Sequence, residues 1–93
     1  MRDYIGIIHK DPESDYGVSF PDFPGCVTAG SSLDEARAMA VEALGFHIEG
    51  MVEDGDPIPA ASSFEAVMSH PDFQDGVAIL VRVPDAKRGP KAA

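Results

Sequence analysis

Residues 16–30 read YGVSFPDFPGCVTAG, and this stretch predicts how the first half of the chain folds. In residues 16–20, large side chains alternate with small ones, which is typical of a half-buried strand. Residues 21–25, PDFPG, contain prolines that cannot donate a hydrogen bond to a sheet, so we expect a loop or a kinked crossing there. Residues 26–29, CVTA, predict a short edge strand. The stretch contains no set of nucleophile, base and metal ligands, so it predicts structure rather than chemistry.

Two more strands are expected outside this stretch. Residues 4–9 alternate between faces, with Ile5 and Ile7 on one side and their neighbours on the other. The turn-forming composition of residues 10–15 predicts that this strand forms a hairpin with the next one. Residues 77–83, VAILVRV, are almost continuously apolar, which predicts a strand covered on both faces or nearly so.

A long helix is predicted after residue 30, where the spacing of apolar residues changes from two to helical. Ser32, followed three positions later by Glu35, forms a capping box that marks the helix start. Gly55 and Pro57 mark its end. One face is mostly apolar and contains Leu33, Ala36, Ala40, Leu44, His47 and Met51. The opposite face carries a row of carboxylates, namely Glu35, Glu42, Glu49 and Glu53.

The order of these elements predicts the fold class. A second capping box at Ser62 or Ser63 predicts one or two helical turns ending near Ser69. The last strand can then lie parallel to the first through a right-handed crossover that contains the long helix. We therefore expect an α+β two-layer sandwich over residues 1–84 (β-β-β-α-β), a three-stranded antiparallel meander plus a fourth parallel strand, with one long helix on one face. Residues 85–93 are expected to form a basic, solvated tail.

The net charge is strongly negative, with 16 acidic and 7 basic residues giving −9. Residues 1–86 hold 4 basic against 16 acidic residues, a net charge of −12. Such a surface repels phosphate backbones, so the composition disfavours nucleic-acid binding. A cationic protein partner is the natural complement. The alternative is that the acidity only supports solubility.

The residue types used in catalysis and metal binding are scattered. His9, His47 and His70 form no His-x-x-x-His pair, and the chain contains no Cys-x-x-Cys, so no zinc site is expected. Cys26 is alone, which excludes an internal disulfide and suits a reducing cytoplasm. We therefore expect no catalytic residue, no metal and no cofactor. We also expect no membrane partner, because no apolar stretch is long enough to span a bilayer.

A longer pattern extends the opening stretch. It reads YGVSFPDFPGCVTAGSSLDEA, followed by the amphipathic helix and by EDGDPIP at residues 53–59. This pattern resembles the HicB-like antitoxin domain of bacterial toxin–antitoxin pairs, over the region from about Tyr4 to Val83. The resemblance implies a pared-down ribonuclease H-like fold without catalytic activity. It also implies a partner, a small basic HicA-like toxin that targets mRNA and is neutralised when its RNA-binding and active surface is covered.

Two features are candidates for contact with such a partner. The helix carboxylates supply negative charge, and an aromatic residue on the proline-fixed loop is a possible interface anchor. The alternatives are that the carboxylates form a solvated outer helix face and that Phe23 folds back over the sheet edge. The expected partner-binding residues are Asp22, Phe23, Glu35, Glu42, Glu49 and Glu53.

Two other functions are compatible with the fold. A metal-dependent nuclease is disfavoured because the first strand has no carboxylate after Asp3, and Glu42 and Glu49 face away from the sheet. A solitary HicB-like scaffold or ligand-binding protein, without a toxin partner, is the main alternative.

Assembly can also be predicted from the pattern. We expect a homodimer, formed through the edge at residues 26–29 or through a helix flank that includes Phe46. Most HicB-like antitoxins carry a C-terminal DNA-binding module, and the ten residues after Val83 are too few for one. Direct DNA binding by residues 1–93 is therefore not expected unless an extension is missing.

Overall fold

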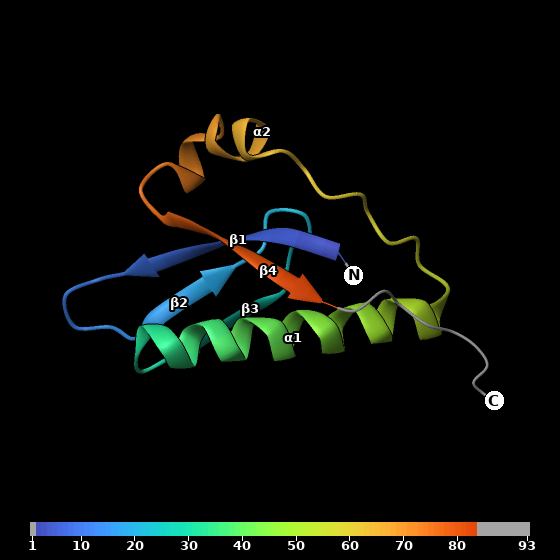
Figure 1. The fold of residues 1–93 in the computed structure, drawn as a ribbon, viewed down its shortest axis with the longest axis horizontal. Helices are drawn as coiled ribbons and strands as arrows, with labels where there is room; N and C mark the ends of the chain where they lie inside the picture. Colours follow the sequence, from blue (N-terminus) through green and yellow to red (C-terminus); the bar gives the residue numbers. More distant parts are fainter. Residues whose placement is uncertain (1, 84–93) are drawn as a thin grey trace.

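The computed structural model describes residues 2–83, so the predicted basic tail at 85–93 lies outside the described residues. One sheet, in the order β3-β2-β1-β4, packs against a long helix (Figure 1). Every neighbouring pair of strands is antiparallel. The elements in chain order are β1 (Arg2–Lys10), β2 (Tyr16–Ser19), β3 (Val27–Gly30), α1 (Leu33–Asp54), α2 (Phe64–Met68), the short 3-10 helix η1 (Pro71–Phe73) and β4 (Val77–Val83).

The alternation in β1 divides the core between the two faces of the sheet. Tyr4 and Ile8 join the main core with α1, whereas Ile5 and Ile7 pack with Val67 of α2 on the other face. The prediction that these pairs point to opposite sides is confirmed. The main core also contains residues from β2, from the loop after it and from β4, including Val18, Phe20, Phe23, Cys26, Val81 and Val83.

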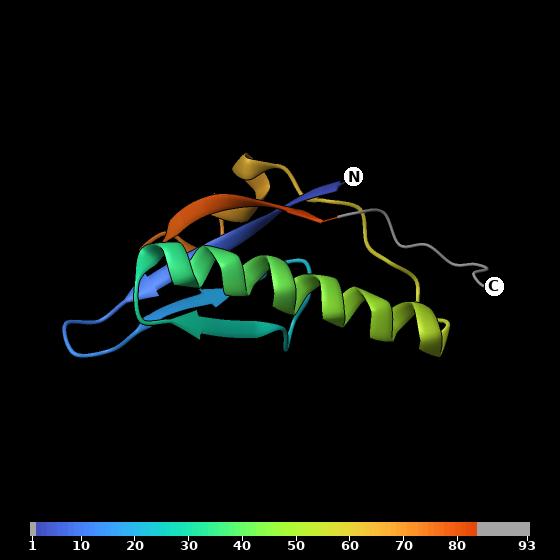
Figure 2. The ribbon, with the colours of Figure 1, turned by 60° about the horizontal axis from the view of Figure 1, so that its bottom comes forward.

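Helix α1 lies across one face of the sheet, as Figure 2 shows. It buries small and branched residues against that face, and the small side chains let the helix approach the strands closely. Ser32 is the N-cap, and Gly55 ends the helix in the left-handed region at φ 78°. Both helix boundaries are confirmed. The buried helix residues are Ala36, Ala40, Leu44 and Ile48.

The predicted direction of the last strand is wrong. β4 runs antiparallel to β1, with Ile8 opposite Val77 and Arg2 opposite Val83. The prediction treated α1 as the whole crossover, which would have delivered the chain to the Arg2 end of β1. Instead, residues 55–76 carry the chain back across the second face of the sheet, so that β4 begins beside Ile8. The sheet is therefore fully antiparallel rather than mixed.

Two details of the predicted layers also change. α2 and η1 partly cover the face opposite α1, where Met68 and Phe73 pack against the cluster around Ile7. β4 is not covered on both faces, because it is the last strand on its side of the sheet. Val77 is 64% exposed and Leu80 is 66% exposed. The core of the prediction, an α+β fold with a four-stranded sheet and one long helix, is confirmed.

Candidate partner-binding face

The exposed side of α1 carries the carboxylates that the sequence placed together. Glu42, Glu49 and Glu53 are all exposed, and their spacing of seven and four puts them on one side of the helix. Within residues 2–83, these three side chains make no hydrogen bond or ion pair in the structure. They are therefore available to bind a positively charged group from another molecule.

Glu35, the first carboxylate of the row, has a different role. One of its carboxylate oxygens, Oε1, accepts hydrogen bonds from the backbone N–H of Ser31 at 2.6 Å and from the Ser31 hydroxyl at 2.9 Å. These bonds favour the charged form and hold the pKa of Glu35 below its usual value. Its own N–H donates to the Ser32 hydroxyl at 3.1 Å. Glu35 thus closes the capping box through Ser31 and fixes the start of α1.

Phe46 lies in the middle of the carboxylate row, a position that was not predicted from the sequence. Its side chain is 78% exposed, the highest value among the large exposed apolar residues of the described chain. The position could have been recognised from spacing, because 46 is four residues after Glu42 and three before Glu49. We call Glu42, Phe46, Glu49 and Glu53 the acidic face of α1.

Phe23 lies in the core instead of at the surface. It is 2% exposed, and its ring meets the edge of Tyr4 at a centroid distance of 4.8 Å and that of His47 at 5.8 Å. The alternative in which Phe23 folds back over the sheet is therefore the one that the structure shows. This placement removes Phe23 from the candidate contact residues.

Asp22 holds the proline-containing loop against the connector that follows α1. Its two carboxylate oxygens accept hydrogen bonds from the hydroxyl of Ser62 at 2.6 Å and from the Ser62 backbone N–H at 2.9 Å. Nearby, the Tyr4 hydroxyl donates to the carbonyl oxygen of Pro59 at 2.6 Å. Asp22 is half-buried and fully engaged inside the molecule, so the structure separates it from the acidic face.

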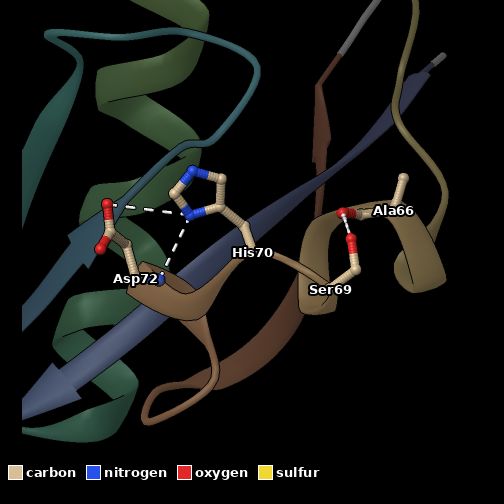
Figure 3. A network of polar contacts seen from close by, with 4 residues as sticks. All are labelled: Ala66, Ser69, His70 and Asp72. Atoms are coloured by element: carbon tan, nitrogen blue, oxygen red, sulfur yellow. Dashed lines mark hydrogen bonds and ion pairs between the residues drawn. The ribbon is translucent and has the colours of Figure 1, made fainter.

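Ser69, His70 and Asp72 place the three residue types of a hydrolytic triad close together (Figure 3). Their hydrogen bonds serve the backbone instead. The Ser69 hydroxyl donates to the carbonyl oxygen of Ala66 at 2.8 Å, away from His70. His70 Nδ1 accepts from the backbone N–H of Asp72 at 3.2 Å and caps η1. With the serine directed elsewhere and Nδ1 used as an acceptor, this group lacks the relay that nucleophilic catalysis needs.

Cys26 is buried beneath α1, with its sulfur 3.9 Å from the carbonyl oxygen of Ala43. Burial raises the pKa of this thiol, which disfavours the reactive thiolate. Among residues 2–83, no group of three His, Cys, Asp or Glu side chains is arranged to hold a metal ion. None of the helices in this region is both long enough and apolar enough to cross a bilayer.

Comparison with known proteins decides the family. The sequence profile described as "HicB_like antitoxin of bacterial toxin-antitoxin system" matches residues 4–92. The chain belongs to this HicB-like antitoxin family. The resemblance seen in the sequence is therefore confirmed over nearly the whole HicB-like chain.

One curated relative is much longer than this HicB-like chain. A 14.9 kDa protein from the rep-hol intergenic region of Haemophilus phage HP1 is 44% identical over 68 residues. The match covers 73% of this chain and 51% of the phage protein. The chain thus spans about half the length of that relative.

Solved structures confirm the fold. The antitoxin HicB of Burkholderia pseudomallei superposes with a TM-score of 0.81 at 29% identity, covering 97% of this chain and 75% of that one. The structure described as a HicA3 and HicB3 toxin-antitoxin complex gives a TM-score of 0.74 at 27% identity, covering 88% and 98%. The four-stranded antiparallel sheet with one long helix is therefore the fold of HicB antitoxins.

Proposed function

We propose that this HicB-like chain neutralises a small basic HicA-like toxin by covering its RNA-binding surface with the acidic face of α1. The observation that carries the proposal is the exposed row of Glu42, Glu49 and Glu53 around the exposed ring of Phe46. An aromatic ring can act as the buried anchor at the centre of an interface, and polar or charged groups form the rim around such an anchor. Family membership and a similar fold in a HicA3 and HicB3 complex support a toxin as the partner.

The electrostatics of the acidic face suit a toxin that binds RNA. A protein that binds phosphates must present positive charge, and a carboxylate row competes with phosphates for that charge. α1 contains six acidic residues and one basic residue, Arg37, which lies on the flank near β4. The acidic face therefore imitates the charge of the RNA that it would displace.

The proposal extends to the way the chain works in the cell. It acts as a non-catalytic binding module, which the raised pKa of the buried Cys26 thiol and the capping role of His70 support. It works in the cytoplasm, a reducing compartment that suits a chain with a single cysteine. It also self-associates as a homodimer. Residues 2–83 leave apolar side chains exposed outside the acidic face, on both edge strands of the sheet.

Charge reversal on the acidic face tests the proposal. We expect E42K/E49K to weaken binding of a HicA-like toxin at least tenfold, about 1.4 kcal/mol, because two attractions become repulsions. F46A should weaken binding by a similar factor through loss of the anchor. Titration calorimetry with purified toxin measures both effects.

The matched control changes the same charges elsewhere. Glu13 lies in the turn before β2 and Glu65 lies in α2, and both are exposed. E13K/E65K alters the net charge as much as E42K/E49K does, so it reports the effect of total charge alone. Equal losses in the two double variants would mean that binding depends on net charge and not on the acidic face. Unchanged binding in E42K/E49K and F46A would reject the proposed surface.

A further inference from the structure

The outer edge of β4 is a second unpartnered surface, separate from the acidic face of α1. Within residues 2–83, β4 is the last strand on its side of the sheet, so alternate backbone groups along seven residues have no strand beside them. Leu80 and Val77 are two of the most exposed apolar side chains on the described surface. Such an edge pairs readily with another strand.

The features that usually protect an edge strand are weak in β4. The strand contains no proline, and its register with β1 is continuous from Val77 to Val83. Its one charged residue, Arg82, is held by Asp3 of β1. Arg82 Nε donates to one carboxylate oxygen of Asp3 at 2.7 Å, and a terminal guanidinium nitrogen donates to the other at 3.0 Å. The opposite edge strand, β3, has only four residues, and its last one, Gly30, is closely packed against the start of α1.

A groove between α1 and β4 extends this edge into a wider apolar surface. It has a volume of about 710 Å³ and lies between the first turns of α1 and the beginning of β4. A smaller hollow continues it along the helix, where half-exposed Val41 faces Ile79 and Leu80. The groove is lined by Ile8, Lys10, Tyr16, Leu33, Arg37, Asp75, Val77, Ile79 and Leu80.

Charge identifies the kind of partner that fits. β4 has no carboxylate, so it offers nothing to attract a cationic toxin. The groove beside it contains two basic residues, Lys10 and Arg37, and one acidic residue, Asp75, so it lacks the carboxylate excess of a chain with net charge −9. A second copy that approaches β4 therefore meets no row of carboxylates there, and screening limits repulsion from more distant charges to about 10 Å at 0.1 M salt.

We propose that the β4 edges of two copies pair antiparallel, with Leu80 on the two-fold axis. In this register all seven residues of each strand are paired, Ile79 lies opposite Val81 of the other copy, and Arg82 lies opposite Ala78. No like charges face each other, and the strand is complementary to itself, as an isologous contact requires. The result is a continuous eight-stranded sheet with both α1 helices on the same face. The inference rests on the self-association proposed above and is independent of toxin binding.

Opposite charges at the two-fold position test this arrangement. L80K places two positive charges against each other across the axis, and L80E places two negative charges there. Leu80 is exposed enough for both variants to fold. We expect each variant of the 93-residue chain to have half the wild-type mass by light scattering at micromolar concentration. A mixture of L80K and L80E should regain the dimer mass, because opposite charges then meet.

V27K is the matched control. Val27 is 68% exposed on β3, the other edge of the sheet, and we expect V27K to remain dimeric. A monomeric wild type would reject self-association itself. A dimeric wild type with dimeric L80K and L80E would reject only the pairing through β4. Monomeric variants that do not associate when mixed would reject the position of Leu80 on the axis.

Discussion

Phe23 joins the proline-containing loop to the core. Its ring packs edge-on against Tyr4 of β1 and His47 of α1, so one side chain connects a loop, a strand and the helix. The backbone of the loop supports this position, because the Phe23 N–H donates to the carbonyl oxygen of Phe20 and the Cys26 N–H donates to that of Phe23. The two prolines that flank it reduce the freedom of the unfolded loop, which favours the folded position.

We predict that F23A lowers the free energy of unfolding by about 3–5 kcal/mol, because it removes a buried ring and leaves a cavity. F46A should change stability by less than about 0.5 kcal/mol, since the ring of Phe46 is largely exposed. Urea denaturation followed by circular dichroism measures both. A stable F23A, or an F46A as unstable as F23A, would contradict the assignment of Phe23 to the core and Phe46 to the surface.

The two phenylalanines show what the sequence could reveal at this scale. Alternation along β1 and helical spacing along α1 depend on local geometry, so they placed Tyr4 and the three surface carboxylates correctly. The direction of Phe23 depends on how the loop returns over the sheet, which local spacing does not contain. Phe46 was predictable, because it has the same helical phase as Glu42 and Glu49.

The junction between β3 and α1 decides where the helix lies on the sheet. A Cβ atom at Gly30 would lie 2.4 Å from the backbone nitrogen of Ala36 and 2.8 Å from its Cα. These are backbone atoms that cannot move without shifting the first turn of α1. The absence of a side chain at Gly30 therefore allows the helix to begin directly over the edge of the sheet.

We predict that G30A destabilises the fold by about 1–3 kcal/mol through overpacking of this junction. G45A is the matched control, because Gly45 lies within α1 and a Cβ there would meet no atom within 4 Å apart from its chain neighbours and the adjoining helix backbone. G45A should stabilise the protein by up to about 1 kcal/mol, the usual difference between alanine and glycine in a helix. Midpoints of urea unfolding at unchanged slope compare the two. Equal effects of the same sign would disprove the close packing at Gly30.

The direction of β4 is a property of the whole molecule. It depends on whether the connector after α1 remains at one end of the sheet or crosses the second face, and hydrophobic spacing within α1 says nothing about that. A signal was present in β1, where Ile5 and Ile7 form a second apolar face that some layer has to cover. Val67, Met68 and Phe73 supply this cover, and it requires the chain to cross the sheet before β4 begins.

Net charge leads to a prediction for the molecule as a whole, in which salt acts in opposite directions on binding and on stability. Screening weakens the long-range attraction between a chain of net charge −9 and a basic toxin. The association rate constant should therefore fall at least tenfold between about 0.05 and 0.5 M salt, a range that brackets a Debye length of about 10 Å. The same screening relieves repulsion among the carboxylates of the free protein, so its melting temperature should rise over this range. Stopped-flow association and thermal unfolding at matched salt concentrations measure the two trends.

E42K/E49K should flatten the salt dependence of the association rate more than E13K/E65K does, because the charges of the acidic face lie closest to the toxin. An association rate that does not respond to salt would show that charge does not guide the two proteins together, and the acidic face would then lose its proposed role.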